Sequence, residues 1–233
     1  MKKLLVCLLV VGMMSAFSGC GDKPDKEPVQ SSVTETSNTE STVEETTVGE
    51  QKDETGFSLG VIDGKTYENK FIGIGCTIAD DWTFYDEEQI KSLNNIAGDI
   101  AGDEYKNMIE QANLVYDMYA TSGDMVSNIN VNMEKLNDVQ NKTLDVKKNY
   151  ELVAPVLVST FENMGCTDVK NEIKDIEIDG KTVPVVYNSA KLGDAVIYQC
   201  LLGIKCDGYL ANIALTATSE DDLNKLVSTL YFI

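Results

Sequence analysis

Residues 169–218 decide the fold, and they read VKNEIKDIEIDGKTVPVVYNSAKLGDAVIYQCLLGIKCDGYLANIALTAT. Turn-forming pairs divide this stretch, and the first of them, Asp179-Gly180, is typical of a type I′ hairpin turn. The stretch therefore predicts four antiparallel strands, over Val169–Ile178, Lys181–Lys191, Ala195–Cys206 and Tyr209–Thr218. The third of these carries apolar side chains on both faces, which is typical of a central strand covered on both sides.

A long helix precedes the strands and a short one follows them. Apolar residues recur at steps of three and four from Thr143 to Met164, and Gly165 stands where a left-handed C-cap belongs. Pro155 predicts a kink or a break inside this helix. Ser219 and Asp222 predict the start of the last helix, whose apolar stripe is formed by Leu223, Leu226, Val227 and Leu230.

The remaining elements lie nearer the amino terminus. They are a hairpin over Tyr67–Ile78, an extended Trp82–Tyr85, a helix from Asp86, a helix over Asp103–Asn113, and strands over Val115–Ala120 and Ser127–Glu134. In the last strand Ile129, Val131 and Met133 are expected to face the core, and Asn128, Asn130 and Asn132 to face water. Tight turns and a non-alternating order predict an α+β fold, an antiparallel β-sheet with helices packed on both faces.

The amino terminus has the pattern of an export signal. Two lysines precede an apolar run over residues 4–17, which is too short to span a bilayer. Ser18-Gly19-Cys20 then resembles the bacterial lipobox, which implies a signal peptide over residues 1–19 and a lipid anchor on Cys20 that holds the protein to the cell membrane, outside the cytoplasm. An ordinary secretory peptide cut at another bond is the alternative.

Two further regions follow the signal. Residues 20–56 begin with the lipidated Cys20 and are acidic, rich in Ser and Thr, and without hydrophobic periodicity, which predicts a disordered tether. Residues 57–233 have the length of a single globular domain.

Composition excludes several functional classes. The chain has a formal net charge of −19 and contains no His, and its 19 basic residues are all Lys. Such a charge repels nucleic acid, and Ser-His-Asp or Cys-His nucleophile systems and His-ligated metal sites are impossible without His. We therefore expect a protein that is not an enzyme and binds no cofactor and no metal.

Four cysteines fall in the domain: Cys76, Cys166, Cys200 and Cys206. Their spacing is not that of a metal site, and an exported protein could oxidise them in pairs. Buried free thiols are the favoured interpretation. Cys200 and Cys206 would lie roughly 20 Å apart on one extended strand, so they could bond only if the chain bends.

The entry to the domain resembles the PsbP-like fold family. The residues that carry this resemblance are Tyr67, Asn69, Gly75, Cys76, Ile78, Asp81, Trp82 and Phe84. The usual Pro and Gly before the tryptophan are replaced here by Asp80 and Asp81. Exported lipoproteins of Gram-positive bacteria with this pattern are common, so the resemblance implies a PsbP-like α/β/α sandwich in such a lipoprotein and assigns no functional residue.

An aromatic trio is the candidate ligand surface. Trp82, Phe84 and Tyr85 could line a sugar or peptide site, and packing in the core is the alternative. A pocket of tyrosines, or sheet-edge tyrosines with hydrated hydroxyls, would be formed by Tyr116, Tyr119, Tyr187, Tyr198 and Tyr209.

Two acidic groups are further candidates. A calcium site or a solvated turn would be formed by Asp80, Asp81, Asp86, Glu87 and Glu88. Acid–base chemistry or a solubilising edge strand would be served by Asp175, Glu177 and Asp179.

These observations together predict an extracytoplasmic, membrane-anchored lipoprotein that binds an envelope protein or a small solute. A solute-binding component of a transport system is the alternative, and an envelope hydrolase that uses carboxylates is a third.

Overall fold

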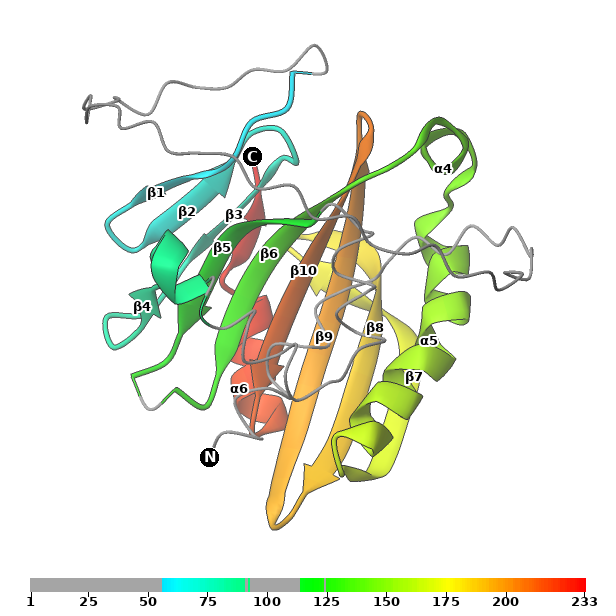
Figure 1. The fold of residues 1–233 in the computed structure, drawn as a ribbon. Coiled ribbons are helices and arrows are strands. Elements are labelled where there is room, and N and C mark those ends of the chain that lie inside the picture. Colours follow the sequence, from blue (N-terminus) through cyan, green and yellow to red (C-terminus); the bar gives the residue numbers. More distant parts are fainter. Residues whose placement is uncertain (1–55, 91, 93–113, 124) are drawn as a thin grey trace, which may run out of the picture.

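The structure is a computed structural model that describes residues 56–90, 92, 114–123 and 125–233. Within these residues the strands form two antiparallel sheets (Figure 1). The large sheet has the order β4-β5-β6-β10-β9-β8-β7. Its strands are β4 (Thr83–Phe84), β5 (Leu114–Thr121), β6 (Asn128–Lys135), β7 (Thr167–Ile178), β8 (Lys181–Leu192), β9 (Ala195–Cys206) and β10 (Tyr209–Ala217).

The small sheet has the order β1-β2-β3-β11. Its strands are β1 (Val61–Asp63), β2 (Thr66–Asn69), β3 (Ile74–Thr77) and β11 (Leu230–Phe232). The helices with described bounds are α4 (Asp138–Thr143), α5 (Val146–Asn163) and α6 (Glu220–Val227). The predicted α+β class with an antiparallel sheet is confirmed.

The four-strand meander has the predicted order, and its first turn has the predicted type. Asp179 and Gly180 have φ values of 48° and 72°, as a type I′ turn requires. The Ala195–Cys206 strand is an interior strand with core residues on both faces, as predicted, and β10 beside it occupies the middle of the sheet and is buried at every residue. β10 is central because it also pairs with β6, a contact over about 80 residues that no local pattern reveals.

Helix α5 packs against one face of the large sheet and ends as the sequence predicts. Its core residues are Tyr150, Val153, Leu157 and Phe161. Gly165 has a φ of +86°, and the N–H of Cys166 donates to the carbonyl of Phe161, as in a Schellman motif. The helix is continuous through Pro155, so the break considered there does not occur.

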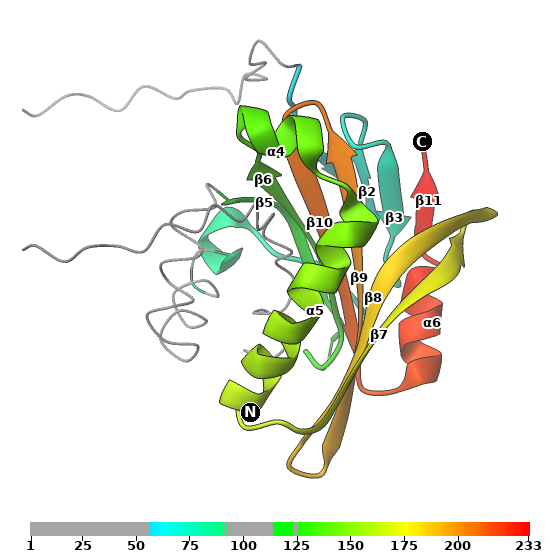
Figure 2. The same cartoon turned by 90° about the vertical axis from the view of Figure 1, so that its right-hand side faces the viewer.

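The other face of the sheet is covered by α6 and the small sheet (Figure 2). Leu223 and Leu226 of α6 belong to the same core cluster as Ile74 of β3 and Ile213 of β10. The predicted helical position of Leu230 is wrong, because α6 ends at Val227 and Leu230 begins β11.

β11 completes the small sheet against a glycine. Tyr231 pairs with Gly75 on β3, where a Cβ would come within 2.6 Å of the tyrosine ring. The hydroxyl of Tyr231 also donates to Glu68, 3.0 Å away. Only glycine allows this close approach, which ties the carboxyl-terminal strand to the amino-terminal hairpin.

Asp117 fastens the small sheet to the large one. A β-bulge between Tyr116 and Met118 leaves Asp117 without a partner on β6. Its carboxylate accepts hydrogen bonds from the N–H of Gly60 at 2.7 Å, the hydroxyl of Tyr67 at 2.6 Å and the side-chain amide of Asn69. We call this group the Asp117 clamp.

The prediction that the asparagines of β6 face water is wrong. Asn128, Asn130 and Asn132 are buried on the face that carries α5, opposite Thr216, Ala214 and Asn212 of β10 respectively. A polar row crosses the sheet there, through directly opposed residues: Asn171, Asn188, Gln199, Thr216, Asn128 and Thr121. The predicted alternation of apolar and polar residues is present, but both faces of β6 are covered, so the polar side chains are buried as well.

The helix predicted from Asp86 begins there. The N–H of Gln89 donates to Asp86, and the N–H of Asp86 donates to Gln89, which is the reciprocal capping box. The rest of that helix and the predicted Asp103–Asn113 helix lie outside the described residues. No helix of the described residues has both the length and the apolar character needed to cross a bilayer.

Candidate functional site

The predicted site residues do not come together. Cys20 lies outside the described residues. Trp82 is buried and Phe84 half-buried against the core cluster shared with α6, whereas Tyr85 packs on the α5 side, against Tyr119 at a ring distance of 4.9 Å. Core packing therefore accounts for the position of each of the three aromatic side chains.

The other candidate groups are also placed by the fold. Asp175 and Glu177 are exposed on β7, the edge strand of the large sheet, and Asp179 is exposed in the turn after it, as expected of a solubilising strand. The acidic group around Trp82 is likewise exposed: Asp80, Asp81, Asp86, Glu87 and Glu88. Across the described ranges no cluster of three or more His, Cys, Asp or Glu side chains is arranged to hold a metal ion.

The tyrosines are less hydrated than predicted. Tyr119 and Tyr209 are buried, and the hydroxyl of Tyr187 is buried as well. The prediction of water-exposed hydroxyls is therefore wrong for these residues, because α5, α6 and the small sheet cover the faces on which they lie.

No disulfide bond joins the four cysteines of the described residues. Cys76, Cys166 and Cys200 are buried and Cys206 is half-buried. Burial raises the pKa of Cys76 and of Cys200 to about 12, so both stay protonated near neutral pH. β9 is regular from Ala195 to Cys206, which keeps Cys200 and Cys206 apart.

A groove between α6 and the outer strands of the large sheet is the candidate site. α6 lies over β9 and β10, and β8 and β7 continue beyond it (Figure 2). The groove encloses about 350 Å³, within the usual range for small-molecule sites. We call it the α6 groove, and its lining is Lys174, Ile176, Glu177, Tyr187, Cys200, Leu223, Asn224, Val227 and Ser228.

The sheet wall of the groove carries a cation, a hydroxyl and a thiol on three adjacent strands. Tyr187 of β8 is directly opposite Cys200 of β9. The Nζ of Lys174 on β7 lies 3.4 Å from the centre of the Tyr187 ring, a cation–π contact. Among the described residues Lys174 has no ion-pair partner, so its charge faces the groove without a counter-ion.

The Tyr187 hydroxyl is a buried hydrogen-bond donor. Burial raises its pKa, and the nearby carboxylate of Glu220 raises it further. No acceptor meets the hydroxyl with hydrogen-bond geometry. Buried amide atoms of Asn128, Asn130 and Asn212 are in the same condition, but Tyr187 is the one that lines the groove, where a ligand or a water molecule can meet its hydroxyl.

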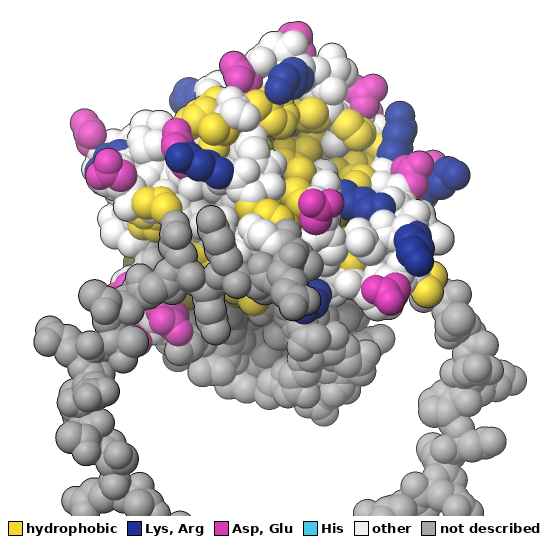
Figure 3. Space-filling view, turned by 90° about the horizontal axis from the view of Figure 1, so that it is seen from above, with side chains coloured by type: hydrophobic (Ala, Val, Ile, Leu, Met, Phe, Trp, Pro, Cys, Tyr) yellow, Lys and Arg dark blue, Asp and Glu magenta, His cyan; other side chains and the backbone are white. Residues whose placement is uncertain are grey.

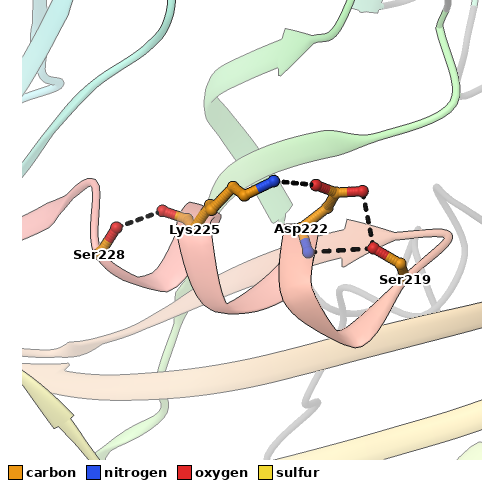
Figure 4. A network of polar contacts seen from close by, with 4 residues as sticks. All are labelled: Ser219, Asp222, Lys225 and Ser228. Atoms are coloured by element: carbon orange, nitrogen blue, oxygen red, sulfur yellow. Dashed lines mark hydrogen bonds and ion pairs between the residues drawn. The ribbon is translucent and has the colours of Figure 1, made fainter.

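The helical wall of the groove is held by a polar network along α6 (Figure 4). The hydroxyl of Ser219 donates to Asp222 at 2.7 Å and accepts from its N–H, which caps the helix. Lys225 pairs with Asp222 at 2.7 Å, and Ser228 donates to the carbonyl of Lys225. These hydrogen bonds lower the pKa of Asp222 and raise that of Lys225.

A second apolar region lies at the end of the sheet where β9 turns into β10. Seen from above, hydrophobic side chains gather in a band bordered by charged ones (Figure 3). At this end Phe57 stacks on Tyr209 at 4.3 Å, and Phe71 meets both rings edge-on. Because these rings bury one another, we assign them to the edge of the core.

Sequence reasoning did not predict the α6 groove. Its lining comes from three strands and one helix that are spread over residues 174–228, and Lys174 reads as one of several charges on a solvated edge strand. The sequence offers only a weak signal, which is two lysines, Lys170 and Lys174, among carboxylates on a strand that pairs with one bearing a tyrosine.

Comparisons with known proteins add little to this geometry. No protein-family model matches the chain, and no curated protein matches it in sequence. Among solved structures the chain is similar to LpqN, described as involved in cell envelope biogenesis of Mycobacterium tuberculosis, with 12% identity and a TM-score of 0.36 over 66% of this chain and 79% of that one. A likeness this slight carries no inference about function, and membership of the PsbP-like family stays a prediction.

Proposed function

We propose that the protein is an exported lipoprotein, anchored to the cell membrane through Cys20, whose domain binds a small solute in the α6 groove without transforming it. The observation that carries this proposal is the groove itself, which has an apolar floor, an unpaired cation and an orphaned hydroxyl. A few polar groups placed over an apolar floor are typical of small-molecule sites.

Two features support binding rather than catalysis. The chain contains no His, so the commonest general base is absent. The thiol that lines the groove, Cys200, is held protonated by burial, and burial also disfavours ionisation of Tyr187. The groove therefore offers hydrogen bonds and apolar surface, but no activated nucleophile.

The export half of the proposal rests on the lipobox-like residues Ser18-Gly19-Cys20. Two or three acyl chains at Cys20 would hold the protein firmly to a membrane, whereas one chain alone gives weak binding. Intact mass of the native mature protein should show cleavage before Cys20 and added acyl mass. Cys20→Ala should abolish the added acyl mass, and an unmodified thiol on the native protein would contradict the anchor.

The binding half is tested by blocking the groove. Asn224 is exposed on the helical wall, so Asn224→Trp should fill the mouth of the groove without entering the core. Asp221→Trp, exposed on the same helix outside the groove, is the matched control. Native mass spectrometry of protein isolated from envelopes should find a small molecule on the wild type and on Asp221→Trp, and none on Asn224→Trp. An empty wild type, or equal occupancy of both variants, would reject the groove as the site.

A further inference from the structure

We infer that the α6 groove selects an amphipathic carboxylate, with the carboxylate at Lys174 and Tyr187 and the apolar body along α6. This inference rests on the proposed function and names the ligand class for the same groove. It is argued from the size of the groove, the chemistry of its floor and the two donors at one end.

The apolar floor of the groove indicates that the body of the ligand is apolar. Ile176, Leu223 and Val227 are apolar, and Cys200 is a buried, protonated thiol that behaves as a small apolar side chain. A volume of about 350 Å³ is at the lower end of the range for small-molecule sites, so the ligand is a small one. A flat, rigid or highly hydroxylated ligand would leave its polar groups against this floor without partners.

The ammonium of Lys174 and the hydroxyl of Tyr187 indicate the chemistry of the ligand's head group. The ammonium of Lys174 lies over the Tyr187 ring and therefore close to the hydroxyl on the edge of that ring. Both groups donate hydrogen bonds. The carboxylate of Glu220 is near enough to raise the pKa of Tyr187, but no acceptor meets the Tyr187 hydroxyl with full hydrogen-bond geometry, and no hydrogen bond or ion pair of the described residues involves the ammonium of Lys174. One carboxylate, with two oxygen atoms, accepts from both donors and neutralises the cation.

The other charges around the groove do not reverse this preference. Glu177 lines the groove and Glu220 lies near Tyr187, and both are exposed, so water screens their charge. Lys174 is half-buried and has no counter-ion. For a ligand in the groove, its charge is therefore less screened by water than the charges of the two glutamates. A ligand cation would have to displace Lys174 from the Tyr187 ring.

The test uses isothermal titration calorimetry on the mature chain, residues 20–233 with Cys20→Ala, produced without the leader and therefore without acyl chains. Four probes share one apolar tail and differ in the head group: octanoate, octanol, octylamine and octyl phosphate. We expect octanoate to bind most tightly. If octanol binds as tightly as octanoate, or octylamine binds more tightly, the assignment of an anionic ligand is overturned. If octyl phosphate binds more tightly than octanoate, the assignment of a carboxylate head group is overturned.

Variants assign the binding to the two donors. Lys174→Met keeps the length of the side chain and should weaken octanoate about tenfold or more, because a charge-assisted hydrogen bond is lost. Tyr187→Phe should weaken it about fivefold for one neutral donor. The matched control is Lys181→Met, since Lys181 lies over the ring of Phe232 at 4.2 Å and outside the groove.

Unchanged octanoate affinity in Lys174→Met would overturn the inference, provided that circular dichroism shows the fold intact. Asn224→Trp separates this inference from the proposed function. Loss of the native ligand in Asn224→Trp together with no octanoate binding to the wild type keeps the groove as the site and rejects only the carboxylate.

Discussion

Removing the Asp117 carboxylate should cost the domain about 3 kcal/mol of unfolding free energy. The change Asp117→Ala removes the acceptor of the Tyr67 hydroxyl and of the Gly60 N–H, and it leaves the Asn69 amide with only a 3.4 Å hydrogen bond to the carbonyl of Ser58. Tyr67 and Asn69 are at most 1% exposed, so water cannot replace the carboxylate at either of them. Each buried group left unsatisfied costs about 1–3 kcal/mol.

The carboxylate itself reduces this total. Burial raises the pKa of Asp117 and its three hydrogen bonds lower it, and burial is the larger effect. The ionised carboxylate is therefore less stable in the fold than in water, and its removal recovers part of the loss. The two side-chain donors that lose the carboxylate cost roughly 2–6 kcal/mol, and the free energy recovered by removing a buried charge leaves a net loss of about 3 kcal/mol.

The assay is urea unfolding of the mature Cys20→Ala chain without the leader, followed by the fluorescence of Trp82, the one tryptophan of the chain and a core residue. A double-mutant cycle with Tyr67→Phe should give a coupling energy of about 1.5–3 kcal/mol, because the phenylalanine leaves no orphaned hydroxyl. Asp175→Ala on the exposed edge strand is the control and should stay within about 0.5 kcal/mol of the wild type. A loss below about 1 kcal/mol for Asp117→Ala, or strict additivity in the cycle, would refute the clamp.

Three further predictions use the same unfolding assay. Asn188→Ala removes the centre of the polar row and should cost about 2 kcal/mol, because Gln199 is fully buried and loses its donor; a neutral result would count against the row. Gly165→Ala should cost about 1–2 kcal/mol at a φ of +86°, and no loss would contradict the C-cap assignment. Burial raises the pKa of the Cys76 and Cys200 thiols from 9.0 to about 12, so the folded state keeps protons that the unfolded chain loses above pH 9. Stability should therefore fall as pH rises beyond about 9, by about 1.4 kcal/mol per pH unit for each thiol, and Cys200→Ala should flatten the fall.

The sequence predicts those parts of the fold that depend on neighbouring residues. The Asp179-Gly180 turn, the Ser219 cap and the Gly165 terminus each appear where local chemistry places them. The same holds for the reciprocal cap at Asp86. In each of these cases a side chain or a backbone angle within a few residues decides the outcome.

Elements that depend on distant pairing are missed. β11 is three residues long, and it forms because Tyr231 fits over Gly75 more than 150 residues earlier in the chain. The central position of β10 has the same origin, since β6 reaches it from the other half of the domain. A strand of three residues has no periodicity to detect, and the order of strands is a property of the assembled sheet.

The candidate site is missed for a related reason. Trp82, Phe84 and Tyr85 attract notice because they are adjacent in sequence, and the fold divides them between two cores. Lys174 and Tyr187 are 13 residues apart on paired strands, and only the cross-strand register brings them into contact. Lone polar residues that converge from several elements carry no sequence signature.

The α5 side of the large sheet carries a row of buried polar side chains, in which atoms of Asn128, Asn130 and Asn212 have no hydrogen-bond partner but the row from Asn171 to Thr216 is connected. On the α5 side Asn171 donates to Asn188, Asn188 to Gln199 and Gln199 to Thr216, so these side chains satisfy one another. A slip of one residue in any of these strands would move its amide into the apolar core on the opposite face, at a cost of several kcal/mol. The row therefore fixes the register of the strands that carry Lys174, Tyr187 and Cys200. That register is the condition for the two groove donors to meet, so a polar row on one face positions the binding groups on the other.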